Sequence, residues 1–107
     1  MEMDRRKHPR FNKTFPIIIH RPYNERKIET IDISLGGAAI HYSQRYYHKD
    51  QVVYIEVILS EGESIFTDAR VAWISPKSVD AEMYKVGLEF TGMSEFDKEK
   101  LKSAIEQ

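Results

Sequence analysis

Two short stretches of the sequence hold residues whose types and spacing could bind a small anion. The first, RRKHPR, places Arg5, Arg6 and Arg10 within six positions, and residues 5–13 carry five positive charges and no negative one. The guanidinium fork pairs with phosphate or with O6 and N7 of guanine, and its flat face stacks on purines. Because Pro9 fixes its own φ and favours extended backbone just before it, we expect the arginines along an extended segment.

The second stretch, DISLGG, spans residues 32–37. The carboxylate of Asp32 can accept N–H groups, and the hydroxyl of Ser34 can both donate and accept. Gly36 and Gly37 tolerate positive φ and let another group approach the backbone closely. Taken alone, DISLGG is typical of a tight turn and RRKHPR of a solvated basic tail.

The bulk composition limits the class of protein and of ligand. The chain has 107 residues, enough for one domain, and it has no cysteine, which excludes disulfides and thiolate sites. A net charge of −1 argues against general nucleic-acid coating, so the positive excess is local and its anion is expected to be small. No apolar run reaches the length of a membrane span and the N-terminus does not resemble a secretory signal, so a cytoplasmic protein is expected.

The elements that must position these residues are mostly strands. Period-two patterns predict six of them, at residues 15–20, 26–33, 37–42, 52–59, 64–75 and 84–90. Within them, Ile31 and Ile33 are expected to oppose Thr30 and Asp32, and Trp73 to continue the core face of Ile65, Thr67, Ala69 and Val71. Ser94 and Asp97 predict the start of a helix with an apolar stripe of Leu101, Ala104 and Ile105. This pattern suggests a mainly β fold, a small antiparallel barrel or sandwich with a C-terminal helix.

Taken together and in this order, Arg6-x-x-x-Arg10, Asp32-x-Ser34-x-x-Gly37, RVAWI, KVGLEF and the helix resemble the PilZ domain over nearly the whole chain. The resemblance implies a six-stranded antiparallel β-barrel over residues 14–107, preceded by a flexible basic segment at residues 1–13. It also implies binding of the bacterial second messenger cyclic di-GMP. The expected ligand-binding residues are Arg5, Arg6, Arg10, Asp32, Ser34, Gly36 and Gly37. An arginine at position 5 is associated in this family with an intercalated ligand dimer, so two ligands per chain are expected.

The resemblance further implies a receptor with no catalytic residue, no metal and no cofactor, which relays the ligand to an unidentified effector protein in motility, polysaccharide or pilus output. An enzyme is disfavoured because no hydrolase, zinc-protease or nucleotide-binding loop motif occurs in the chain. Two alternatives remain open: a ligand-independent adaptor of the same fold, and a small nucleic-acid-binding barrel that stacks bases on Tyr46 and Tyr47.

Overall fold

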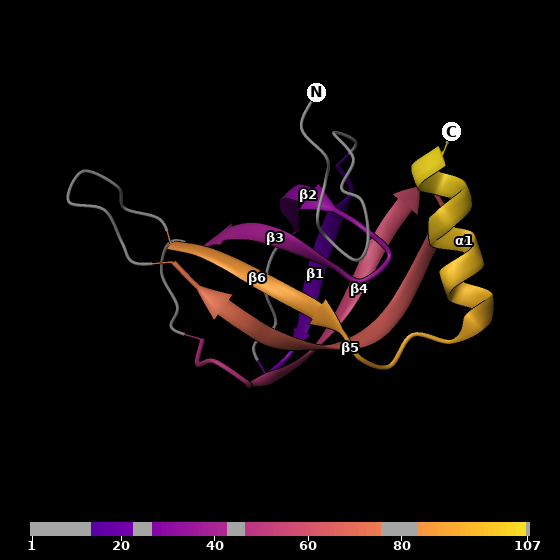
Figure 1. Ribbon diagram of the computed structural model, residues 1–107. Coiled ribbons are helices and arrows are strands. Elements are labelled where there is room, and N and C mark those ends of the chain that lie inside the picture. The colour runs from indigo at the N-terminus through magenta and orange to yellow at the C-terminus, as the bar shows by residue number, and fades with distance from the viewer. Residues whose placement is uncertain (1–13, 23–26, 43–46, 76–83, 107) are drawn as a thin grey trace, which may run out of the picture.

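The structure, a computed structural model, describes residues 14–22, 27–42, 47–75 and 84–106 (Figure 1). Six strands and one helix follow one another along the chain. They are β1 (Pro16–Arg21), β2 (Ile28–Ile33), β3 (Gly37–Tyr42), β4 (Val52–Ser60), β5 (Glu63–Ile74), β6 (Tyr84–Phe90) and α1 (Glu95–Glu106). Each strand predicted from the sequence is present, with ends that differ by at most two residues.

The six strands form a closed antiparallel barrel in the order β1-β2-β3-β6-β5-β4. Figure 1 shows the strands wrapped around one another, with α1 at the side of the barrel next to β4 and β5. The barrel, its antiparallel pairing and the C-terminal helix confirm the predicted fold class. The segment that carries Arg5, Arg6 and Arg10 lies outside the described residues, so its predicted flexibility is not tested.

The barrel interior is filled mostly by β-branched side chains, which pack well on a pleated sheet. The largest fully buried side chains are Ile17, Ile19, Ile33, Ile40, Val53, Ile55, Val57, Ile65, Thr67, Val71 and Leu101. The last of these comes from α1, where Leu101 and Ile105 are buried and Ala104 packs partly against the same core. The apolar stripe predicted for the helix is therefore confirmed.

The helix begins as its sequence predicts. The hydroxyl of Ser94 accepts a hydrogen bond from the backbone N–H of Asp97 at 3.1 Å, and its carbonyl accepts the N–H of Lys98 at 2.9 Å. Such a cap satisfies N–H groups that have no partner inside the first turn. Among the described helices, none is long and apolar enough to cross a membrane.

Two expectations about which way side chains face are wrong, and both errors come from bulges. The pairing of β5 with β6 shifts by one residue between Val71 and Trp73, so Trp73 leaves the core face and is 39% exposed. The pairing of β2 with β3 shifts between Thr30 and Asp32, so Thr30 faces inward with Ile33 and is 3% exposed. A bulge inserts one extra residue and so reverses the alternation beyond it.

The barrel closes between β1 and β2 along a short seam. The two strands pair at only two positions, Pro16 with Glu29 and Ile17 with Ile28. Beyond them the Thr30 hydroxyl continues the connection: it accepts the N–H of Phe15 at 3.0 Å and donates to the carbonyl of Phe15 at 2.9 Å. A buried side-chain hydroxyl thus satisfies both backbone groups of Phe15 where the ladder ends.

Candidate functional site

The turn between β2 and β3 brings together the residues of the DISLGG stretch. The backbone N–H of Ser34 donates to the carbonyl of Gly37 at 2.8 Å, and this bond closes the turn. The Ser34 hydroxyl donates to the same carbonyl at 3.4 Å and accepts the N–H of Gly36 at 3.2 Å. Because Ser34 is only 3% exposed, its hydroxyl holds the shape of the turn in this structure.

Gly37 is needed because the backbone of β6 lies directly against it. A Cβ at this position would lie 2.1 Å from the carbonyl oxygen of Leu88 on β6, which is far inside van der Waals contact. The adjacent carbonyl of Gly36 accepts the N–H of Phe90 at 2.9 Å, so the turn is also bonded to the end of β6. The sequence analysis gave two reasons for glycine here, positive φ and close approach to the backbone, and Gly37 does not have positive φ. The requirement is for close strand approach.

A row of four residues crosses the outer face of the barrel beside this turn. Asp32 pairs with Ala39, Ala39 with Gly87, and Gly87 with Trp73, across β2, β3, β6 and β5. The two middle residues are small, and the indole of Trp73 lies over Gly87, where an added Cβ would be 2.1 Å from the ring. Four adjacent strands span about 14 Å. Ala39 is 1% exposed and Gly87 is also buried, so the middle of the row is covered, with a carboxylate at one end and an aromatic ring at the other.

The next row on the same face contains an arginine that is ion-paired with two carboxylates. Gly37 pairs with Glu89, and Glu89 pairs with Arg70 on β5. The Arg70 guanidinium donates to Glu89 at 3.0 Å and also forms an ion pair with Asp50. Hydrogen bonds to Glu89 and then to Asp50 raise the pKa of Arg70 above its ordinary value, so it stays charged. Arg70 offsets carboxylate charge that would otherwise repel an anion near Gly37.

The family model of the PilZ domain matches residues 4–107, which is nearly the whole sequence and includes both arginine and DISLGG stretches. The chain belongs to the PilZ domain family. No curated protein matches the sequence.

Solved PilZ structures share the fold of this PilZ domain. The inhibitor of motility MotI (DgrA) of Bacillus subtilis superposes with a TM-score of 0.80 at 21% identity, over 98% of this chain and 51% of that one. MrkH of K. pneumonia, solved as a c-di-GMP complex, gives 0.74 at 21% identity, over 94% and 51% of the two chains. The PilZ domain of Escherichia coli YcgR with c-di-GMP gives 0.70 at 19%, over 95% and 89%. The chain thus spans about half the length of MotI and MrkH.

This PilZ domain places four of the seven expected ligand-binding residues at one site. Asp32, Ser34, Gly36 and Gly37 lie in or beside one turn on the outer face of β2 and β3. Arg5, Arg6 and Arg10 lie outside the described residues. Within the described part of the chain, no group of three or more His, Asp or Glu side chains is placed to hold a metal ion.

Two residues border this site that the sequence analysis did not assign to it: Trp73 was expected in the core, and Arg70 was not singled out. Both belong to RVAWI, and the bulge between Val71 and Trp73 reverses the direction expected for Trp73. A signal for Trp73 was present in KVGLEF. Gly87 interrupts a strand there, and a glycine inside a strand marks the close approach of another group. For Arg70, the alternation of residues 64–71 already placed its side chain on the outside of the barrel.

Proposed function

We propose that this PilZ domain binds cyclic di-GMP on the outer face of its barrel, beside the β2–β3 turn. In this proposal Arg5, Arg6 and Arg10 contact the phosphates and guanines, Asp32 accepts guanine N–H groups, and the ligand lies beside the backbone of Gly36 and Gly37, where the absence of a Cβ on Gly37 lets β6 pack closely behind the turn. Ser34 contributes by holding the turn. Two of the matching structures, MrkH and the YcgR PilZ domain, are complexes with c-di-GMP, which supports the same ligand here.

The observation that carries the proposal is the path of the chain next to the turn. Thr30 is bonded to Phe15 and β1 is antiparallel to β2, so the chain preceding Phe15 enters the barrel from the side toward which β2 runs. Asp32 lies on that side, two residues beyond Thr30. Arg10 is four residues before Thr14, and four residues span at most about 14 Å. The arginine segment is therefore tethered within reach of the Asp32–Gly37 turn.

The chemistry of the two parts is complementary. Cyclic di-GMP carries two phosphate charges, which suit guanidinium groups, and its guanines offer O6 and N7 acceptors to the same groups. The guanine Watson–Crick edge presents N–H donors, which suit the Asp32 carboxylate. Trp73 lies in the same row as Asp32 and is 39% exposed, so its ring is available to stack on a guanine.

The proposed output is a ligand-dependent contact with a partner protein. Binding would fix three arginines that neighbour both the ligand and the barrel, and so would change the surface that a partner meets. The domain offers no catalytic group in this scheme, and its signal is a change of shape and charge.

Isothermal titration calorimetry with cyclic di-GMP tests the proposal. The wild type is expected to bind, and Arg10→Ala is expected to lower affinity by at least about tenfold, because a charge-assisted hydrogen bond contributes roughly 1.5–3 kcal/mol. Lys102→Ala, which removes an exposed positive charge on α1, is the matched control and should bind like the wild type. Folded wild-type protein that gives no binding heat would refute the proposal and favour the ligand-independent adaptor. Tight binding of single-stranded DNA in its place would favour the nucleic-acid alternative.

A further inference from the structure

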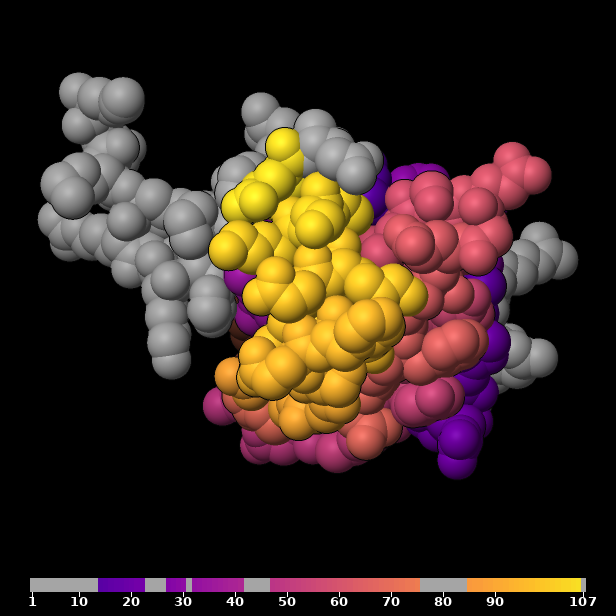
Figure 2. Space-filling view, turned by 90° about the vertical axis from the view of Figure 1, so that its right-hand side faces the viewer, coloured from indigo at the N-terminus to yellow at the C-terminus, as the bar shows by residue number. Residues whose placement is uncertain are grey.

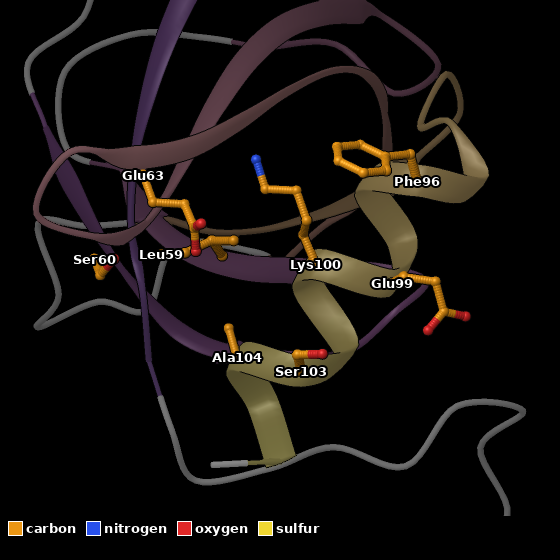
Figure 3. A pocket seen from close by; sticks show the side chains of 8 residues that line it. All are labelled: Leu59, Ser60, Glu63, Phe96, Glu99, Lys100, Ser103 and Ala104. Carbon is orange, nitrogen blue, oxygen red and sulfur yellow. The ribbon is translucent and has the colours of Figure 1, made fainter.

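A groove separate from the β2–β3 turn runs between α1 and the end of the barrel where β4 turns into β5. Figure 2 looks onto α1, in yellow and orange, which lies against the pink atoms of these strands. The groove has a volume of about 340 Å³. Its lining residues are Leu59, Ser60, Glu63, Phe96, Glu99, Lys100, Ser103 and Ala104 (Figure 3).

The helix residues of the groove form a second stripe on α1. Positions 96, 99, 100, 103 and 104 repeat at intervals of three and four, so they lie along one side of the helix. This stripe is next to the one formed by Leu101 and Ile105, which is buried in the barrel core. From Phe96 to Ala104 the helix rises about 12 Å. The groove is therefore long enough for about four residues of extended chain at 3.3 Å each.

The floor and one end of the groove are apolar. Leu59 is buried at the bottom, and Ala104 packs partly against the core. Phe96 is 74% exposed, the largest exposed fraction among the large hydrophobic side chains of the described residues. A single exposed aromatic is ordinary, but one that borders a concave surface with an apolar floor offers a pocket for an apolar side chain.

The charged side chains around the groove differ in the contacts that they make. The ammonium of Lys100 lies 5.8 Å from the Phe96 ring centroid and 3.4 Å from the carbonyl oxygen of Ser64, so it already has partners. Glu63 extends from the hairpin toward the helix, and Glu99 projects outward from the helix at the outer edge of the groove (Figure 3). Within the described part of the chain, neither carboxylate forms an ion pair. The contacts of Lys100 leave it charged, so the two carboxylates and one ammonium of the lining leave a net charge of −1.

We infer that this groove docks a short basic, apolar segment of a partner protein. An apolar side chain of the segment covers Phe96 and Leu59, and flanking Lys or Arg side chains meet Glu63 and Glu99. Charge complementarity favours this occupant, because two of the three charged lining residues are carboxylates, which would repel an acidic segment. The inference concerns a surface remote from the Asp32–Gly37 turn and does not depend on cyclic di-GMP binding.

Selection from a random library of about eight-residue peptides displayed on phage tests this inference, since the segment spans about four residues plus its flanks. The bait is the full chain, with counter-selection on the double variant Phe96→Ser/Glu99→Lys. We expect the enriched peptides to combine Leu, Ile, Phe or Met with Lys or Arg. Both substituted side chains are exposed, so the double variant should keep the wild-type circular dichroism spectrum and melting temperature.

Fluorescence anisotropy with the most enriched peptide gives the quantitative result. Glu99→Lys is expected to weaken its binding by at least about tenfold, since the substitution replaces attraction by like-charge repulsion. Glu29→Lys makes the same charge change on exposed β2 and is expected to leave affinity within about twofold.

Three results would overturn the inference: no enrichment, enrichment of acidic peptides, or equal affinity for the wild type and the double variant. Analytical ultracentrifugation of the chain alone tests whether a second copy of the chain occupies the groove. A dimer that dissociates on Phe96→Ser would assign the groove to a second copy of the chain.

Discussion

Gly37→Ala is the substitution whose effect follows most directly from the geometry of the site. The added Cβ would lie 2.1 Å from the Leu88 carbonyl oxygen, whereas real Cβ atoms essentially never approach closer than 3.0 Å. The contacted atom is backbone, so no side-chain rotation relieves the clash. The strands β3 and β6 must therefore separate locally by about 0.9 Å, the difference between these two distances.

The same movement breaks a neighbouring bond. The N–H of Phe90 donates to the carbonyl of Gly36 at 2.9 Å, and a shift of 0.9 Å takes it beyond about 3.2 Å, the upper end of normal N–H···O distances. Overpacking costs typically about 1–3 kcal/mol and a lost hydrogen bond about 1 kcal/mol. We expect a loss of about 2–4 kcal/mol in the free energy of unfolding. At about 4 °C or more per kcal/mol, the melting temperature should fall by roughly 8 °C or more.

Thermal unfolding followed by circular dichroism, together with urea titration, measures this loss. Gly92→Ala is the matched control, because the Cβ there would meet Asp68 at 3.4 Å, an ordinary contact. It should change the melting temperature by no more than about 2 °C, as surface substitutions usually stay within about 0.5 kcal/mol. A Gly37→Ala protein as stable as the Gly92→Ala protein would show that β3 and β6 are not held at the distance seen here. The explanation of the second glycine of DISLGG would then fail.

Three further predictions concern the ligand and the opposite wall of the barrel. Arg5→Leu should reduce the calorimetric endpoint from two cyclic di-GMP per chain toward one, since leucine has neither charge nor a stacking plane, and a wild-type endpoint of one would contradict it. Trp73→Ala should weaken cyclic di-GMP binding by roughly tenfold, because base–aromatic stacking contributes about 1–3 kcal/mol, and unchanged affinity would remove Trp73 from the site. Hydrogen bonds from Ser64 and, to a smaller extent, from His20 lower the pKa of Glu56 in the folded protein below 4.5. The stability that these bonds give the fold is therefore complete above pH 4.5 and is lost as the pH falls through the pKa of the folded state. The melting temperature of the wild type should therefore exceed that of Glu56→Gln near neutral pH and approach it below pH 4.5, and a difference that stays constant would exclude this linkage.

The fold was predictable because apolar and polar residues alternate along its strands. Residues Ile65, Thr67, Ala69 and Val71 all face the core, as period two requires. Trp73 does not, because the bulge after Val71 inserts one residue without changing the composition of the segment. A bulge depends on how two distant strands align, and this information is not local to either of them.

The sequence analysis named four residues that the structure brings together at one turn, but not what Ser34 and Gly37 do there. Asp32, Ser34, Gly36 and Gly37 lie together because they are close in the sequence. The Leu88 carbonyl behind Gly37 belongs to β6, some 50 residues further along the chain, whereas the hydrogen bonds of Ser34 are local to the turn. Long-range packing therefore decides why position 37 is glycine, and the burial of Ser34 emerges only in the folded barrel.

The short pairing between β1 and β2 determines where the barrel can open locally. A closed barrel frays first where its ladder is shortest, and here two residue pairs, together with the backbone N–H and the hydroxyl of Thr30 bonded to Phe15, hold the two strands together. The strand that would peel away is the one that continues into the arginine segment. A ligand that held those arginines against the β2–β3 turn would connect β1 to β2 across this short pairing. Occupancy of a surface site would thereby slow the opening of the whole barrel.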